Sequence, residues 1–161
     1  MPTTIILLRH GATAANTARP YTLQGARPDS ELVDLGRSQA AAAGRALAEF
    51  PISRIYSSPL RRAQETAEII AAVGGSSVSV EEGLIEADTG EWTGMTWEEI
   101  ERRWPFECAA FHADAERHGY LGGENLRQVR DRVLPVVEGL VEKHPEEMIA
   151  IVCHGVVNRV L

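Results

Sequence analysis

The 161-residue chain is predicted to fold as a single three-layer α/β/α domain with a mostly parallel central sheet and a small helical cap insertion. Three observations predict this class. Short apolar runs alternate along the chain with stretches of helical periodicity, which is typical of α/β proteins. The apolar runs are continuous, as in parallel strands that helices cover on both faces. The length suits one core of ordinary size.

The first half of the chain alternates strand and helix. The opening apolar run predicts a strand, and an Ala-rich stretch that stops at Pro51 predicts the first helix. The Gly74-Gly75 pair predicts the end of the second helix. In order, we expect a strand at 4–8, a helix at 34–50, a strand at 52–57, a helix at 60–73 and a strand at 78–81.

The second half begins with the predicted cap, at about residues 92–122, and ends on another strand. Thr96 and Glu99 have the spacing of a capping box, which predicts that a helix starts there. We expect helices at 96–104, 107–118 and 124–144, followed by a buried strand at 148–152.

The composition argues against several classes of function. The formal net charge is −7 and no basic run gathers anywhere, which argues against nucleic-acid or membrane partners. The two cysteines, Cys108 and Cys153, lack metal-binding spacing and are expected to be reduced. The N-terminal apolar run is too short for a signal peptide or a membrane span, so a cytoplasmic protein is expected.

Two strands distant in sequence end in the same way. His10-Gly11 follows the first predicted strand and His154-Gly155 follows the last. Since ligands of parallel sheets collect at the carboxyl ends of the strands, both histidines are expected in one site. Glycine allows the backbone to approach a ligand closely, and free amides at a following helix start can bind an anion.

Two further segments contain charged residues that are candidates for the same site. Arg61 and Arg62 lie in the first turn of a predicted helix, where a cation is unfavourable unless an anion is near. We interpret Arg61 as a solvated surface residue. Glu86 follows an apolar pair, and a carboxyl in such surroundings can serve as a general acid. From these residues alone, Asp88 and Glu91 are equal candidates for that role.

Six ordered segments resemble the histidine phosphatase superfamily, also called the phosphoglycerate mutase-like family. They are "LRHGATAAN", "QG" at positions 24 and 25, "SSPLRRAQETA", "LIEADTGEWTGMT", "GGEN" and "VCHGVV". The similarity extends from Thr4 to Leu161. It implies a metal-independent phosphomonoesterase, without a cofactor, that acts on a small phosphorylated metabolite through a phosphohistidine intermediate.

The resemblance also implies roles for individual residues. His10 resembles the nucleophile and Glu86 the proton donor to the leaving group. Gln24 and Gly25 lie where relatives line the substrate side of the pocket. The implied phosphate-binding residues are Arg9, Asn16, Arg62, His154 and Gly155, the last through its backbone amide.

Some positions depart from the family pattern. Ala12 stands where relatives usually have Glu or Gln, and the spacing from Asn16 to Gln24 is longer than usual. Relatives usually continue well past the second His-Gly pair, so the C-terminal end is shorter here. An apolar sheet edge is then expected to be exposed, with weakened stability or self-association, for example as a homodimer.

The family also contains mutases, which carry a longer basic insertion between the acid and the second histidine. The segment here is short, and its arginines at 127, 130 and 132 are interpreted as the solvated face of a helix. A phosphatase is therefore favoured over phosphoglycerate mutase-type phosphotransfer. The tryptophans and Phe106 of the cap either cover the leaving group or pack the inserted helices.

Two alternatives from other classes stay open. His10, Glu86, Asp88 and His154 could instead hold a metal ion in a hydrolase, although Arg9 beside His10 argues against a second cation there. A non-catalytic domain that binds a phosphorylated ligand could also have kept this pocket.

Overall fold

The computed structural model describes residues 2–161 and contains a four-stranded sheet in which every strand pair is parallel. The strand order is β1-β4-β2-β3. The strands are β1 (Thr4–Arg9), β2 (Ile52–Ser57), β3 (Ser77–Val80) and β4 (Met148–Cys153). The mostly parallel sheet predicted from the sequence is confirmed, and each of the four strands begins and ends within one residue of its expected bounds.

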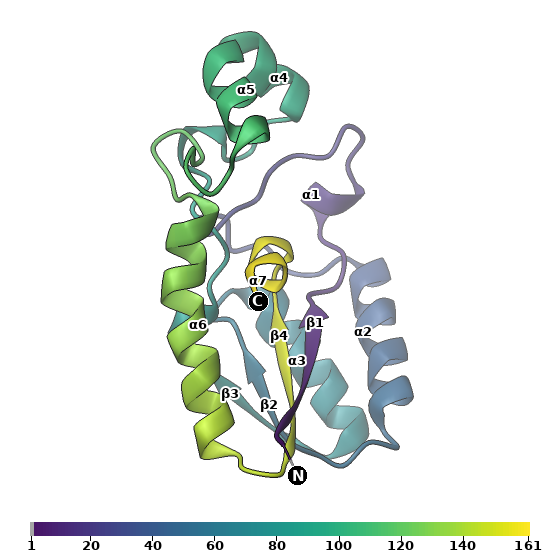
Figure 1. Cartoon of the computed structure of the whole chain (residues 1–161). Helices are drawn as coiled ribbons and strands as arrows, with labels where there is room; N and C mark the ends of the chain where they lie inside the picture. The colour runs from purple at the N-terminus through teal and green to yellow at the C-terminus, as the bar shows by residue number, and fades with distance from the viewer. Residues whose placement is uncertain (1) are drawn as a thin grey trace.

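Helices cover both faces of the sheet, as Figure 1 shows. α2 (Asp34–Leu47) and α3 (Arg61–Gly74) pack on one face, and α6 (Leu126–Lys143) and α7 (Gly155–Val160) pack on the other. β4 alternates between them: Ile149 and Ile151 join the core under α6, while Ala150 and Val152 join the core under α3. The three-layer α/β/α class is confirmed.

The remaining helices lie beyond the carboxyl ends of the strands (Figure 1). They are α1 (Ala14–Thr17), α4 (Trp97–Arg103) and α5 (Pro105–Ala113), with two 3-10 turns at Glu82–Leu84 and Gly90–Trp92. Thr96 caps α4 by accepting a hydrogen bond from the Glu99 amide at 3.2 Å, so the predicted capping box is confirmed.

Three helix bounds were predicted wrongly. The helix expected at 34–50 ends at Leu47. The helix expected at 107–118 begins earlier, because Pro105 suits a first turn, and it ends at Ala113 before a turn closed by Asp114. The short helix α1 was not expected, since four residues carry no usable periodicity.

β1 forms one edge of the sheet. Its only strand partner within residues 2–161 is β4, and Leu7 in this strand is 39% exposed. An edge strand with an exposed leucine matches the expected apolar edge. Self-association through it stays a prediction.

Candidate active site

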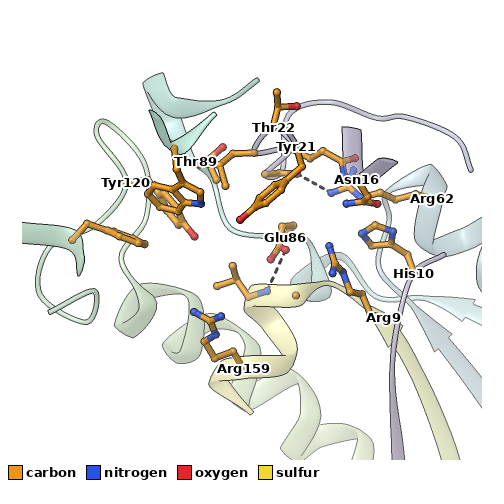
Figure 2. Close-up of a pocket in the computed structure, with 17 residues that line it drawn as sticks. Arg9, His10, Asn16, Tyr21, Thr22, Arg62, Glu86, Thr89, Tyr120 and Arg159 are labelled. Carbon is orange, nitrogen blue, oxygen red and sulfur yellow. Dashed lines mark hydrogen bonds between the residues drawn. The ribbon is translucent and has the colours of Figure 1, made fainter. Parts of the chain in front are cut away.

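The carboxyl ends of β1, β2 and β4 surround a cavity of about 280 Å³, shown in Figure 2. Most of the residues singled out from the sequence meet there. Those that line the cavity are Arg9, His10, Asn16, Gln24, Gly25, Arg62, Glu86 and Gly155. His154 lies fully buried behind them, with its ring centroid 5.2 Å from that of His10.

His10 directly follows β1, and its amide continues the strand ladder by donating to the Cys153 carbonyl at 3.0 Å. Its Nδ1 lies 2.7 Å from the Gly11 carbonyl oxygen, which can only accept, so Nδ1 carries the proton. Nε2 is therefore the atom with a free lone pair. Burial, together with the charges of Arg62 and Arg9, lowers the pKa of His10 to about 4. The imidazole is neutral at physiological pH.

Gly11 allows helix α2 to approach this loop. A Cβ on Gly11 would lie 2.5 Å from the Gly36 carbonyl oxygen in the first turn of α2. The Gly11 amide donates to the Thr66 hydroxyl on α3 at 3.0 Å. The glycine after His10 is thus required by packing between the loop and two helices.

His154 is held by the turn after β2. Its Nε2 lies 2.6 Å from the Ser58 hydroxyl, while its buried Nδ1 has no partner in the described part of the chain. Burial and the nearby charges of Arg62, His10 and Arg9 lower the pKa of His154 to about 2. His154 is therefore a neutral ring with one unsatisfied nitrogen, not an additional cation.

Arg62 and Arg9 supply the positive charge beside His10. Arg62 is 1% exposed and donates to the carbonyls of Gly25 and Pro28, both at 2.8 Å, while its buried Nε has no partner among residues 2–161. The side chain of Arg9 lies along Gly155, where a Cβ would be 3.7 Å from Nε. An anion in the cavity would satisfy these donors.

Arg61 lies outside the cavity. It is 63% exposed and pairs with Glu31 at 3.1 Å, as the interpretation of a surface residue predicts. The first turn of α3 therefore points one arginine outward and one inward.

Asn16 and Gln24 both use their amide oxygen within the protein. The Asn16 oxygen accepts from the Thr13 amide at 3.0 Å and from the Thr13 hydroxyl at 2.9 Å. The Gln24 oxygen accepts from the Ser30 hydroxyl at 3.0 Å. These bonds orient both side chains and leave their NH₂ groups, which can donate to a bound ligand.

Glu86 lies in the middle of the cavity wall, where Figure 2 shows it between Arg9 and Arg159. Its carboxyl oxygens accept from the Ala87 amide at 2.9 Å and the Val156 amide at 3.3 Å. Burial outweighs these bonds and raises the pKa of Glu86. A raised pKa keeps the carboxyl available as a proton donor closer to neutral pH.

The other two acids considered with Glu86 do not line this cavity. Asp88 forms a two-point ion pair with Arg27, with both N–O distances 3.0 Å, and this bond lowers the pKa of Asp88. Glu91 is exposed. Within residues 2–161, no group of three or more His, Cys, Asp or Glu side chains is arranged to hold a metal ion.

Arg132 was interpreted wrongly as part of a solvated helix face. Its guanidinium donates to the carbonyls of Gly83, Ile85 and Glu86 at 2.9–3.0 Å and pairs with Glu124 at 2.8 Å. It therefore clamps the segment that carries Glu86. Its partners are mainly backbone carbonyls far away in sequence, which no side-chain pattern reveals.

The aromatic residues of the cap divide between the two expected roles. Trp97 lines the cavity together with Phe111 and Tyr120, whereas Trp92 is fully buried and packs against them edge-on. Phe106 is 86% exposed and takes no part. Tyr21, Tyr120 and Arg159 also line the cavity, although none of the three was assigned to the site from the sequence.

The sequence predicts neither a membrane-spanning helix nor a disulfide bond. No helix between residues 2 and 161 is long and apolar enough to cross a membrane. Cys108 and Cys153 are both buried and unpaired, as expected.

Known proteins resemble the chain over nearly its whole length. Residues 5–161 match the family described as "histidine phosphatase superfamily (branch 1)". A glucosyl-3-phosphoglycerate phosphatase of Mycolicibacterium vanbaalenii is 37% identical over 158 residues, which cover 94% of this chain and 68% of that one. A metal-independent phosphoserine phosphatase of Arabidopsis thaliana is 35% identical over 165 residues, covering 99% and 67%. Among solved structures, a phosphoserine phosphatase of Entamoeba histolytica in complex with 3-phosphoglyceric acid superposes with a TM-score of 0.85 at 29% identity, covering 98% and 77%.

Proposed function

The chain belongs to the histidine phosphatase superfamily, and from the geometry of its cavity we propose that it hydrolyses a small phosphomonoester through a phosphohistidine at His10. One observation carries the proposal. The neutral His10 ring has its free Nε2 in a cavity shared with two arginines and with Glu86, an acid of raised pKa.

The first step transfers the phosphoryl group to the enzyme. The Nε2 lone pair of His10 attacks phosphorus, and the bond between phosphorus and the ester oxygen breaks on the opposite side. The ester oxygen takes the proton of Glu86, so the product leaves as a neutral alcohol. The Gly11 carbonyl, which accepts from Nδ1, stabilises the positive charge that develops on the ring.

The second step returns the enzyme to its starting state. Glu86, now a carboxylate, takes a proton from water as the water oxygen attacks phosphorus. The phosphorus–nitrogen bond breaks, its electron pair returns to Nε2 of His10, and inorganic phosphate leaves. Arg9 and Arg62 neutralise the phosphoryl oxygens throughout, as guanidinium forks do well.

The substrate is proposed to be a small phosphorylated metabolite. The relatives are named for glucosyl-3-phosphoglycerate and phosphoserine, and a third was solved with 3-phosphoglyceric acid. We assign residues 92–122 as a cap, because α4 and α5 lie beyond the strands and Trp97 and Phe111 line the cavity. A cytoplasmic location is proposed on the two buried free thiols.

Hydrolysis of p-nitrophenyl phosphate in the presence of EDTA tests the proposal. His10→Ala should abolish turnover, whereas the control His118→Ala, which changes an exposed histidine outside the cavity, should leave it unchanged. Full activity of His10→Ala would exclude the mechanism. Loss of wild-type activity with EDTA and rescue by zinc would favour a metal hydrolase. A folded protein that binds phosphate without turnover would favour a binding domain, and transfer between phosphoglycerates would favour a mutase.

A further inference from the structure

Arg159 is a cavity residue that the proposed chemistry does not use. It lines the same cavity as His10 and Glu86, yet its side chain makes no hydrogen bond or ion pair with any other residue between positions 2 and 161. A guanidinium with five donors that faces a cavity without a protein partner is available to a ligand.

The helix α7 places Arg159 away from the phosphate-binding residues. Gly155, which lies against Arg9, starts α7, and Arg159 follows four residues later on the same helix face. Four residues of helix advance about 6 Å. Figure 2 accordingly shows Arg9 and Arg159 on opposite sides of Glu86.

The electrostatics separate the two arginines in the same way. The charge of Arg9 contributes to the lowered pKa of both His10 and His154. The charge of Arg159 acts instead on Tyr120, whose pKa burial and Glu86 raise to about 12. Arg159 therefore lies outside the cationic group that surrounds His10.

The direction of the reaction places the leaving group on the side of Arg159. In-line transfer puts the ester oxygen opposite His10, where Glu86 protonates it, so the rest of the alcohol must extend beyond Glu86. The walls there are largely aromatic, and Arg159 is the one cation among the lining residues of that side, within the part of the chain that the structure describes. The aromatic lining residues are Tyr21, Trp97, Phe111 and Tyr120.

We propose that Arg159 determines specificity by binding a carboxylate on the leaving alcohol, so that the preferred substrates are phosphomonoesters of hydroxy acids. The proposal rests on the proposed function, because it assumes that Glu86 faces the leaving group. One guanidinium matches one carboxylate in charge and can bind it through two parallel hydrogen bonds. A second phosphate group, with up to two negative charges, would find a single cation here.

Two substrates that differ only in the carboxylate test this assignment. O-Phosphoserine and O-phosphoethanolamine share the phosphate, the ester carbon and the amino group. We expect Arg159→Gln to lower kcat/KM for phosphoserine about tenfold to a hundredfold, the range of a hydrogen-bonded charge, mainly through KM. For phosphoethanolamine the change should stay within about twofold. Arg159→Lys should recover part of the loss, and the control Arg127→Gln, at an exposed position outside the cavity, should change neither substrate.

A calorimetric titration with 3-phosphoglycerate and with glycerol 3-phosphate makes the same comparison without turnover. Tighter binding of 3-phosphoglycerate, lost in Arg159→Gln alone, supports the proposal even if hydrolysis fails and the proposed function with it. Equal effects of Arg159→Gln on both ligands and both substrates would overturn the proposal. If the protein hydrolyses both substrates and Arg159→Gln leaves the ratio of their kcat/KM values unchanged, the proposed function stands but the proposed role of Arg159 is wrong.

Discussion

Replacing Glu86 by glutamine is expected to separate the two halves of the reaction. The shape is kept, but one carboxyl oxygen becomes an NH₂ group that cannot accept from the Ala87 amide at 2.9 Å or the Val156 amide at 3.3 Å. The loss of one of these bonds should cost about 1 kcal/mol of stability, which a urea titration would measure. The loss of the proton donor should slow hydrolysis of an alkyl phosphate by about 10²–10⁴-fold.

The same variant should behave differently with an aryl phosphate. p-Nitrophenolate leaves without protonation, so Glu86→Gln should still form the phosphoenzyme quickly, whereas its breakdown lacks the base. Rapid mixing with p-nitrophenyl phosphate should then give a burst of about one p-nitrophenolate per enzyme, followed by slow turnover. Equal slowing of alkyl and aryl substrates without a burst would refute the assignment of Glu86 as the acid and base.

Five further predictions concern the nucleophile, the packing of two glycines, the clamp on the Glu86 segment and the sheet edge. Because burial lowers the pKa of His10 to about 4, kcat/KM for an aryl phosphate should fall only below about pH 4, as the attacking ring becomes protonated; a midpoint near 6.5 in the pH–rate profile would contradict this. Gly11→Ala places a Cβ 2.5 Å from a backbone oxygen and should destabilise the fold by about 1–3 kcal/mol in urea unfolding. Gly139→Ala, a helical position with open space, should instead stabilise it by about 0.5–1 kcal/mol. Arg132→Met removes the hydrogen bonds that clamp the Glu86 segment, so it should lower the free energy of unfolding by about 3 kcal/mol and also lower kcat. A variant with unchanged stability and unchanged kcat would disprove this role of Arg132. If β1 self-associates, Leu7→Lys at its exposed edge should shift sedimentation towards the monomer, and a monodisperse wild-type monomer would refute the expectation.

The strands and the two histidines could be predicted because the signal is local. A continuous apolar run ending in His-Gly identifies both a buried strand and its carboxyl end, and parallel pairing then brings His10 and His154 together. Gly75 likewise marks the end of α3, because it adopts the left-handed conformation that glycine favours, whereas the helix expected to run to Pro51 ends at Leu47.

Which acids and arginines face the site could be decided only from the tertiary structure, because residues of the same charge lie close together in the sequence. Arg61 and Arg62 share a helix turn, and only the packing of α3 decides which one faces inward. Glu86 differs from Asp88 because Arg27, from a distant loop, pairs with the latter. Arg159 had a usable signal, since it lies four residues after Gly155 on a helix that begins at the site.

The most direct test of the central claim is rapid quenching of the enzyme during turnover of ³²P-labelled substrate. We expect a phosphoenzyme that survives alkali but is lost in acid, maps to the peptide containing His10 and is absent from His10→Ala. Active enzyme that never accumulates or exchanges such an intermediate, or an acid-stable phosphoryl group on another residue, would contradict it.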